Sequence, residues 1–440
     1  MKLIVNLKSK HCLTGILLLL FCLLSLQSQE RFRRNPPYPE PLNPMKFPPI
    51  ESGLLTSGLR VVTITRLNRP LFNLVVIVQA GENDSPRQLS GLATITAQML
   101  LKGTLSLSSQ ALEERMESLG LSGSIEVRAD YILYSFSFLE ENLEDCLRLI
   151  GSLFYEPAFS PLELAAVKRD FYYEQLARKK DPEKCGYDFF LTKLFAGTGY
   201  NPGVVDEDSI RNISQKDVSS FHQRFIRPNN SIIVLDGNIN LNNASLKISQ
   251  SFSRWVSRPL ERPPVPRLRN MNYETILFLD LPTPDVSVIM GNAISPLGSE
   301  DYYALLVLNQ LIGGSPTSRL FLNLRESRGL AYYAFSQLSY FKNNGLFWIR
   351  SKTSAQSVGQ VVKEILAQVN SLLEERIDPH ELEKAKAYLA GNFPLENQHP
   401  EQMAKKVGLQ FMFQLPADFW NRYYENLLVV SSEKVQEVAR

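Results

Sequence analysis

The chain has 440 residues, of which 44% are hydrophobic and 21% charged, and its formal net charge is +2. This length accommodates two domains of ordinary size, each with its own hydrophobic core. A charge so close to balance excludes the strongly basic surface of a nucleic-acid-binding protein and gives no sign of an acidic partner.

The first 28 residues have the pattern of a secretory signal peptide. Lys2, Lys8 and Lys10 precede an uncharged apolar run at 13–26, and the small residue Ser28 follows at a cleavage position. The run is shorter than the roughly 20 apolar residues that a membrane span needs. We therefore predict export with cleavage, to the periplasm, and no membrane span beyond this segment; an uncleaved anchor remains an alternative.

If the chain is exported, its four cysteines raise two questions, lipid attachment and disulfide formation. Cys22 offers a second alternative, a lipid anchor, although the bulky Phe21 precedes it where lipid attachment favours a small residue. Cys12 and Cys22 lie in the signal, which leaves Cys146 and Cys185 as a pair that an oxidising compartment could join. Because Cys146 falls on the buried face of a predicted helix, we favour two separate thiols.

Two proline-rich stretches divide the rest of the chain. Residues 29–53 have no periodicity and predict an extended leader on the surface. Residues 253–271 predict a linker, because prolines at that density break both helices and strands. The predicted domains are therefore 54–252 and 272–440.

These two parts repeat each other. Residues 160–168 return as 378–386, and each copy has a helix-capping residue, then proline, then an acidic first turn. Residues 92–103 likewise parallel 303–314. The sequence therefore predicts two homologous domains.

Strand-like and helix-like patterns alternate in both parts. Apolar runs at 74–78 and 132–138 in the first part and at 346–350 in the second predict strands. The spacing of apolar residues at 361–373 predicts an amphipathic helix. We expect an α+β fold in which each domain is a mostly antiparallel sheet packed with helices.

The repeat is incomplete at its second copy. A helix that starts near Ser214 leads to an apolar strand at 231–236, whereas the matching helix at 432–440 is followed by no such strand. Either the second domain lacks its last strand or this sequence is truncated. The first alternative predicts an exposed sheet edge in the second domain.

Residues 90–104 read Ser-Gly-Leu-Ala-Thr-Ile-Thr-Ala-Gln-Met-Leu-Leu-Lys-Gly-Thr and resemble the active-site helix of the pitrilysin/insulinase-type zinc peptidases. That family reads Ser-Gly-Leu-Ala-His-x-x-Glu-His-Met-x-x-Lys-Gly-Thr, the inverted zinc-binding motif. The surrounding frame matches, but the working residues do not. Thr94 and Gln98 stand at the two histidine positions, and Ala97 stands at the general base.

The chemistry of zinc explains what these changes imply. A catalytic zinc takes three His, Glu, Asp or Cys side chains, and the glutamate of the motif deprotonates its water. Thr94 and Gln98 are poor ligands, and Ala97 cannot accept a proton. The downstream glutamate of the family is matched by Glu174, but Val167 stands where the family usually has another. We predict no metal, no cofactor and no catalytic residue in this chain.

The histidines offer no other metal site. His222, His380 and His399 each stand alone, with no partner three to five residues away. We predict that each has a structural or solvated role. The sequence also has no paired-cysteine, phosphate-loop or serine-nucleophile motif.

One motif of the second half is intact. Residues 315–332 resemble the family's pattern Ser-x-x-Ser-Arg-Leu-Phe…Arg-x-x-x-Gly-Leu-Ala-Tyr. Ser315 is predicted to cap a helix that Gly329 ends. The resemblance implies that Arg325 and Tyr332 reach the zinc site of another half or subunit. There a guanidinium fork and a phenol would suit the developing oxyanion of a peptide substrate.

Two glycines precede this motif. The related mitochondrial processing peptidase has a longer glycine-rich loop that contacts substrate in its non-catalytic subunit. Gly313 and Gly314 are the only glycines at that place here. We retain them as candidate substrate-binding residues, although a turn into the helix is the simpler role.

The resemblance implies a non-catalytic, substrate-binding subunit of a heterodimeric zinc metallopeptidase. Its partners would be a homologous zinc-bearing subunit and an unfolded peptide substrate bound as an added strand. The alternative is a purely structural homologue, like the respiratory-complex core proteins that share this fold. An autonomous enzyme with a different site is a third possibility.

Overall fold

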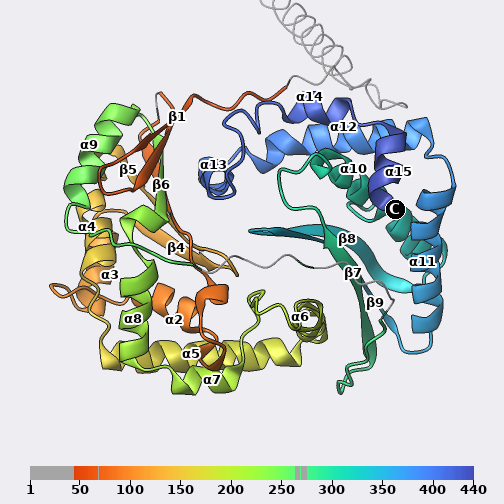
Figure 1. The fold of residues 1–440 in the computed structure, drawn as a ribbon, viewed down its shortest axis with the longest axis horizontal. Coiled ribbons are helices and arrows are strands. Elements are labelled where there is room, and N and C mark those ends of the chain that lie inside the picture. Colours follow the sequence, from red (N-terminus) through yellow and green to blue (C-terminus); the bar gives the residue numbers. More distant parts are fainter. Residues whose placement is uncertain (1–43, 68, 263–267, 269–274) are drawn as a thin grey trace, which may run out of the picture. The chain divides into compact units, whose positions relative to one another are not determined.

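The computed structural model describes residues 44–440 except 68, 263–267 and 269–274. The predicted signal, with Cys22, lies outside the described residues, as do residues 29–43 of the leader and residues 263–267 and 269–271 of the predicted linker. Both halves belong to one unit, Pro44–Arg440. Figure 1 shows this unit coloured along the sequence.

The first half contains a six-stranded sheet with the strand order β1-β2-β6-β3-β5-β4. Its strands are β1 Ile50–Leu54, β2 Arg60–Thr65, β3 Leu71–Val78, β4 Ser122–Val127, β5 Ile132–Leu139 and β6 Ser231–Gly237. β2 runs parallel to β6, and every other neighbouring pair is antiparallel. The last strand in sequence, β6, therefore lies in the middle of the sheet.

The second half contains a three-stranded antiparallel sheet with the order β7-β9-β8. Its strands are β7 Asp285–Ile294, β8 Ala331–Phe341 and β9 Asn344–Ser354. In this sheet β7 is an edge strand among the described residues, whereas its counterpart β3 is paired on both sides.

Helices surround both sheets (Figure 1). In the first half they are α2 Leu92–Met99, α3 Ser109–Ser118, α4 Leu143–Tyr155, α5 Pro161–Lys180, α6 Pro182–Leu194, α7 Glu207–Asn212, α8 Gln215–Phe225 and α9 Leu241–Ser251. In the second half they are α10 Tyr302–Ile312, α11 Val358–Glu374, α12 Pro379–Glu396, α13 Pro400–Met412, α14 Tyr423–Leu428 and α15 Ser432–Ala439.

Short helical turns complete the description. The 3₁₀ turns are η1 Glu82–Asp84, η2 Arg87–Leu89, η3 Glu140–Asn142 and η4 Pro228–Asn230. The segment η5, Phe321–Ser327, is a π-helix. Single turns of π-helix are rare and are often found at functional sites.

The central strand β3 explains how the two halves pack together. Because neighbouring side chains of a strand point to opposite faces, Leu74 and Val76 join the core of the first half. Val75 and Ile77 point the other way and join the core that contains the helices of the second half. An apolar run without polar alternation is therefore required, since both faces of β3 are buried.

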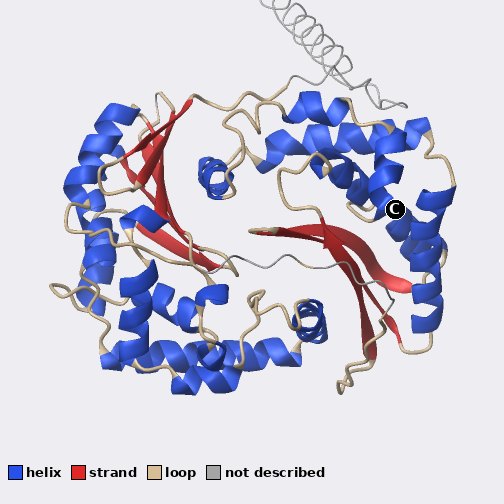
Figure 2. Cartoon of the chain, in the orientation of Figure 1, coloured by secondary structure: helices blue, strands red, loops and turns tan. Residues whose placement is uncertain are grey.

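Helix α13 of the second half covers the first sheet (Figure 2) and contacts β3 and β6. Gly408 permits the close approach, because an added Cβ would lie 2.6 Å from Cδ1 of Ile77. Polar contacts flank this packing: Ser135 Oγ donates to Glu401 Oε1 at 2.9 Å, and Arg66 Nη2 lies 2.8 Å from Met403 Sδ. The two halves thus share one of their cores.

The predicted fold class is confirmed: both halves are α+β, with mostly antiparallel sheets. The predicted strands at 74–78, 132–138 and 346–350 lie within β3, β5 and β9, and the helix predicted at 361–373 lies within α11. The apolar runs and the helical spacing of apolar residues therefore predict the centres of these elements correctly.

The structure shifts two predicted boundaries. Residues 50–53, assigned to the leader, belong to β1, and Phe47 before them is buried against Phe393. Trp255, assigned to the linker, packs in the first core and donates its indole N–H to the Ile226 carbonyl at 3.0 Å. In both cases the folded part extends into a proline-rich segment, and an aromatic side chain of that segment is buried in a core.

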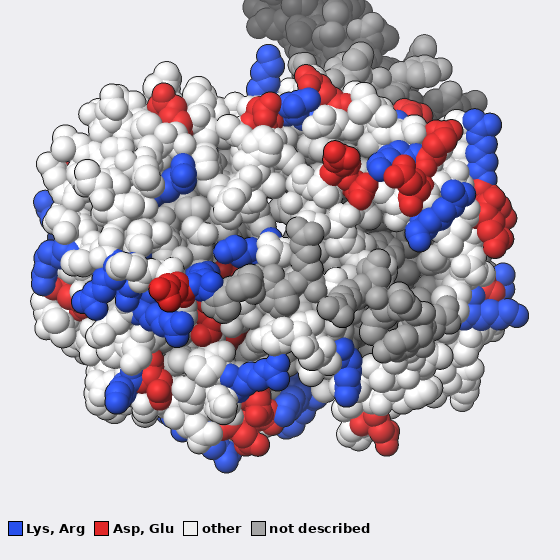
Figure 3. Space-filling model, viewed as in Figure 1, with Lys and Arg blue, Asp and Glu red and all other residues white. Residues whose placement is uncertain are grey.

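The surface carries both signs of charge side by side on the face drawn in Figure 3. This distribution agrees with the near-neutral composition. In the described part of the chain, no helix is both long enough and apolar enough to cross a membrane.

Candidate functional site

Helix α2 carries the degenerate motif. Thr94 and Gln98 are half-buried and line a cavity of about 570 Å³, so the structure places them on one face of the helix. Ala97 is fully buried in the core instead. The helix begins after Gly91, which has a φ of 93°. A side chain there would be strained and would also lie 2.9 Å from the Phe171 ring.

A buried carboxylate caps this helix, and the sequence analysis missed it. Glu82 accepts from the backbone N–H groups of Gly91 at 3.0 Å and Thr94 at 2.9 Å. The Thr94 hydroxyl donates to the same carboxylate at 2.5 Å, and Ser85 Oγ donates to it at 3.1 Å. A negative side chain at a helix N-terminus satisfies orphan N–H groups and the helix dipole.

The environment of Glu82 sets its protonation behaviour. Complete burial raises the pKa of the Glu82 carboxyl, and the hydrogen bonds from Thr94 and Gly91 oppose that rise. The Thr94 hydroxyl is therefore committed to a neighbouring carboxylate. The only sequence signal for this cap is an acidic residue in the turn before the motif. The capping position itself is occupied by Gly91, which has no side-chain acceptor, so the sequence around the helix start gives no sign of a cap.

The residual glutamate of the motif lies at the same cavity. Glu174 on α5 lines it together with Thr94 and Gln98. Val167, at the position of the family's other glutamate, is buried in the first core. Strand β8 of the second half contributes Tyr340 and Phe341 to the wall. The cavity therefore lies between the zinc-motif helix and the sheet of the second half.

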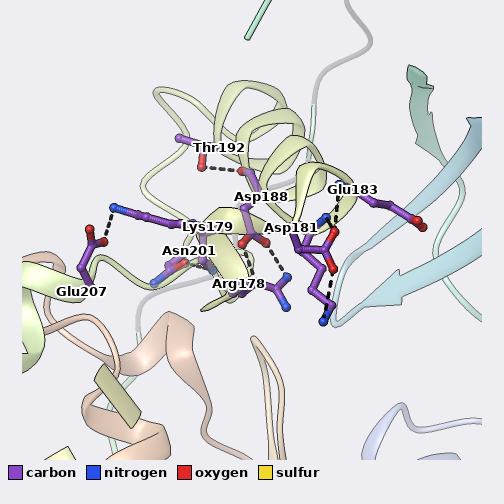
Figure 4. A network of polar contacts seen from close by, with 10 residues as sticks. Arg178, Lys179, Asp181, Glu183, Asp188, Thr192, Asn201 and Glu207 are labelled. Atoms are coloured by element: carbon purple, nitrogen blue, oxygen red, sulfur yellow. Dashed lines mark hydrogen bonds and ion pairs between the residues drawn. The ribbon is translucent and has the colours of Figure 1, made fainter. Parts of the chain in front are cut away.

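An ion-pair network fixes the rim of the cavity where α5 turns into α6 (Figure 4). Arg178 and Asp188 form a two-bonded pair at 2.5 and 2.6 Å, and both line the cavity. Lys179 pairs with Glu207, and Asp181 caps α6 by accepting from the backbone of Glu183 at 3.0 Å. These contacts hold Glu174, one turn before Arg178, in a fixed wall.

The donor set does not fit a catalytic zinc. Thr94 and Gln98 are neutral oxygen and amide groups, and Glu174 is the one carboxylate of the family's ligand positions present at the cavity. Among the described residues, no group of three or more His, Cys, Asp or Glu side chains is placed to hold a metal ion. A zinc site with three strong protein ligands cannot be assembled from these residues.

Arg325 and Tyr332 lie together and are not among the residues that line this cavity. Arg325 is in the π-helix η5, and its Nη1 donates to the backbone carbonyl of Tyr332 at the start of β8. Its guanidinium carbon lies 5.5 Å from the centre of the Phe321 ring. The Arg325 side chain is 50% exposed and Tyr332 is 58% exposed, so both are accessible to another molecule.

The helix around this pair differs from the prediction. Ser315 accepts from Thr317 in an irregular turn, and regular helical structure begins only at Arg319. Gly329 ends the π-helix with a φ of 59°, as predicted for a glycine stop. A side chain with β-branching or bulk would be strained at that place.

The two candidate glycines have packing roles. Gly313 is buried, and an added Cβ would lie 2.3 Å from the backbone nitrogen of Ser336 on β8. A Cβ on Gly314 would lie 2.6 Å from Oε1 of Gln310. These close approaches account for both glycines without a ligand.

Of the three histidines, His222 has a structural contact, whereas His380 and His399 are exposed. His222 is half-buried, and its Nε2 lies 2.9 Å from the Phe154 carbonyl oxygen; desolvation of the imidazole lowers its pKa to about 4. His399 precedes α13, and His380 lies in the first turn of α12. Cys146 and Cys185 are both free thiols; Cys146 is buried, as expected, whereas Cys185 is half-buried and not buried as predicted.

Two models of one peptidase family match consecutive parts of the chain. The model described as "Insulinase (Peptidase family M16)" matches residues 60–205, and the model described as "Peptidase M16 inactive domain" matches residues 212–389. The boundary between the matches falls before α8, whereas the second sheet begins later.

Curated relatives span nearly the whole chain. The "uncharacterized zinc protease YmxG" of Bacillus subtilis is 24% identical over 391 residues, which are 87% of this chain and 93% of the relative. The "non-peptidase homolog YmxG" of Helicobacter pylori is 23% identical over 376 residues, 84% of this chain and 85% of the relative.

Solved structures share the fold. A "peptidase M16 inactive domain" from Pseudomonas fluorescens has a TM-score of 0.83 and 22% identity, covering 89% of this chain and 94% of that one. A protease from Helicobacter pylori has a TM-score of 0.77 and 20% identity, covering 90% and 96%. With Thr94, Ala97 and Gln98 at the motif positions, the chain belongs to the M16 (insulinase) family of peptidases as a non-catalytic member.

Proposed function

We propose that this chain is the non-catalytic, substrate-binding subunit of a heterodimeric zinc metallopeptidase. The observation that carries the proposal is that the Arg325–Tyr332 pair and the degenerate motif do not line the same cavity. The motif helix lines a cavity without zinc ligands, whereas Arg325 and Tyr332 are exposed and do not line that cavity. An exposed guanidinium and phenol that do not line the cavity of their own chain are suited to a site on another chain.

The chemistry of the pair supports this role. A guanidinium presents several N–H donors in a planar fork, and a phenol adds an O–H donor. Both suit the oxygen of a peptide carbonyl as it gains negative charge on attack by zinc-bound water. The π-helix and the bond from Arg325 to the Tyr332 carbonyl fix the spacing between the two side chains.

The partner would be a homologous subunit that carries the intact His-x-x-Glu-His motif and its zinc. The substrate would be an unfolded peptide bound as an added strand along a sheet edge. The N-terminal pattern of Lys2 to Ser28 extends the proposal to export, with the periplasm as the compartment.

The proposal is tested by reconstitution with the zinc-bearing partner. Arg325→Ala and Tyr332→Phe should each lower kcat/KM for a fluorogenic peptide by about 10²–10³, the usual effect of removing one oxyanion donor. Arg325→Lys should also be damaging, because a point charge does not replace a planar fork. Size-exclusion chromatography should show an intact complex in each case.

Matched controls are available on the same half. Arg422 and Tyr388 are both exposed and lie outside the motif, so Arg422→Ala and Tyr388→Phe should leave kcat/KM unchanged. Full activity of an Arg325→Ala, Tyr332→Phe double variant in an intact complex would rule out the proposed role.

A structural role is the second candidate. The observation in its favour is the bond from Thr94 to Glu82, because a side chain at a former ligand position now stabilises a helix end. In that case the chain would hold an assembly together, and variants of Arg325 and Tyr332 would matter only if they changed folding or assembly.

A further inference from the structure

Four arginines lie close together where α8 ends and where the segment after α9 begins. Arg224 is in the last turn of α8 and Arg227 follows that helix, whereas Arg258 and Arg262 belong to the later segment. Two of them share one aromatic neighbour: the guanidinium carbon of Arg224 lies 4.9 Å from the centre of the Phe225 ring, and that of Arg262 lies 5.7 Å from it. We call these four residues the arginine cluster.

The positive charges of the cluster are close enough to affect one another. Burial lowers the pKa of Arg227, and the charges of Arg258 and Arg224 lower it further. Burial likewise lowers the pKa of Arg262, where Asp84 opposes this effect and Arg224 adds to it. Like charges at such separations raise the free energy of the folded chain, and an anion bound between them would lower it.

Acidic side chains offset little of this charge. Within the part of the chain that the structure describes, Arg262 reaches Asp84 at 3.9 Å, and no ion pair involves Arg224, Arg227 or Arg258. Arg224 and Arg258 are exposed, and Arg227 is half-buried. Three guanidinium groups that solvent can reach therefore have no carboxylate partner.

Hydrogen bonds to the backbone hold the cluster together. Arg227 Nη1 donates to the Pro259 carbonyl at 3.2 Å, and Asn229 Nδ2 donates to the Arg258 carbonyl at 3.0 Å. These bonds fix the segment after α9 against the end of α8. Figure 3 shows a group of basic side chains, in blue, on the drawn face of the first half near α8.

Exposed apolar side chains border the cluster. Val256, two residues before Arg258, is 64% exposed. Ser257 Oγ donates to the Ser57 carbonyl and so joins the turn after β1 to the same place, and Leu54 at the end of β1 is 66% exposed. The boundary of a lipid bilayer offers headgroup phosphates and acyl chains side by side. It fits such a surface better than an acidic polypeptide, which would match the arginines alone.

We propose that the arginine cluster, with Val256 and Leu54, is a docking surface for a membrane that contains anionic phospholipids. Each guanidinium fork binds headgroup phosphate oxygens through paired N–H groups, and the two apolar side chains enter the interface. Such contact lies on the bilayer and is reversible, unlike a membrane span. It is compatible with the export predicted from residues 1–28 and independent of the proposed role of Arg325 and Tyr332.

The test is co-sedimentation with lipid vesicles. The chain is used without residues 1–28, so that the apolar run at 13–26 cannot itself insert, and it retains the whole unit Pro44–Arg440. It should bind vesicles of phosphatidylcholine mixed with phosphatidylglycerol and should not bind vesicles of phosphatidylcholine alone. Added salt should release it, because salt screens exposed charges.

Variants locate the surface. Arg224→Gln with Arg258→Gln should weaken binding at least tenfold, since each basic residue near an anionic surface contributes about fivefold. The matched control is Arg148→Gln with Arg169→Gln, which removes two exposed arginines from α4 and α5 and changes the net charge equally. It should leave binding unchanged. Glu261→Gln should strengthen binding, because Glu261 is exposed in the same segment as Arg258.

The apolar contribution and the identity of the anion are tested separately. Val256→Ser changes no charge and should still weaken binding, because less apolar surface enters the bilayer. Binding to anionic vesicles that the Arg224→Gln, Arg258→Gln variant does not weaken would overturn the proposal. Binding of poly-glutamate in place of vesicles would also overturn it and would identify an acidic polypeptide as the partner. Calorimetric binding of inorganic phosphate without vesicle binding would identify a free anion instead.

Discussion

Helices α2 and α10 occupy corresponding places in the two halves, yet the residues at a matching position differ in chemistry. In α2 the positions that face outward are Thr94 and Gln98, which line a polar cavity. By the internal repeat, Thr94 corresponds to Leu305 of α10, which lines a small, mostly apolar pocket of about 90 Å³ beside strand β7. The matching position is therefore polar in the first half and apolar in the second.

The two halves also differ in their sheets and in which motif of the family they retain. The first half has a complete sheet, with β6 at its centre, and an altered motif. Among the described strands of the second half, β7 pairs with β9 alone, and this half has an intact Arg325–Tyr332 pair. The first half thus keeps its sheet without the ligand residues of the motif, and the second half keeps the Arg325–Tyr332 pair.

The largest expected effect comes from restoring the ligands of the first half. Thr94→His with Gln98→His would place two imidazoles at the cavity that Glu174 also lines, which is a His₂Glu donor set. We expect zinc content, measured by elemental analysis, to rise from no stoichiometric metal to about one ion per chain. The Glu82 cap should survive, because it also accepts from the backbone of Gly91.

The control for this experiment is the same double variant with Glu174→Ala, which should lose the metal. Peptide hydrolysis should stay absent while Ala97 remains, because no general base is present. Stoichiometric zinc in the unaltered chain, or no zinc in a folded double variant, would show that the cavity does not have the inferred ligand geometry.

The sequence predicted the elements of both halves but not how they complete each other. Caps such as Ser214 and Asp378 are local signals, and both lie at the helix starts that they predicted. The role of Glu82 could not be predicted, because its contact with Thr94 spans a turn whose path depends on the folded chain. The burial of Trp255 was also missed, since it depends on the distant Ile226 carbonyl.

For the candidate site, the sequence predicted the residues but not all of their local structure. The motif frame identified Thr94, Gln98 and Glu174, which the structure brings to one cavity although Glu174 lies on another helix. The π-helical form of the segment that carries Arg325 was not predictable, because Ser315 and its proline favour an ordinary helix start. Local propensity is a weak guide where tertiary packing decides the last turn.

The next largest effect concerns acid stability and belongs to the first half alone. Burial lowers the pKa of His222 to about 4, from an ordinary value of 6.5. The native state therefore binds fewer protons than the unfolded state between these values, and stability is lost as the pH falls through that window. A difference of this size corresponds to about 3 kcal/mol.

His222→Gln should remove this loss, because glutamine can still donate to the Phe154 carbonyl but does not titrate. The measurement is urea denaturation of both proteins at about pH 7 and about pH 4. Asp236 acts in the opposite direction, since burial raises its pKa to about 6 and stability falls as the pH rises toward that value. It is present in both proteins and cancels in the comparison. An acid loss that is the same in both proteins would contradict the assignment to His222.

Ala439 is the counterpart of His222 in α15, seven residues after the first residue of each helix. It has no titratable group, so the corresponding helix of the second half should not contribute to this acid loss. Ala439→Gln should therefore leave the difference in stability between the two pH values unchanged.

The smallest expected effect compares the caps of the same two helices. Ser214 accepts from the Asp217 backbone N–H, and the Asp217 carboxylate accepts in return from the Ser214 N–H at 2.9 Å. Ser431 accepts from the Lys434 backbone N–H at 3.2 Å and has no reciprocal partner at that residue. Loss of a cap costs about 0.5–2 kcal/mol, so Ser431→Ala should cost about 1 kcal/mol and Ser214→Ala closer to 2.

A second measurement separates the cap from other effects of the substitution. The hydrogen bond from Ser214 is the main cause that holds the pKa of the Asp217 carboxyl below its ordinary value. Ser214→Ala should therefore raise that pKa in an NMR titration, whereas Ser431→Ala should leave it unchanged. Ser249→Ala serves as the control for stability, because its exposed hydroxyl bonds only the Leu246 carbonyl within the same helix. Equal losses for Ser214 and Ser431 would mean that the reciprocal bond adds nothing, and that the two halves cap these helices with equal strength.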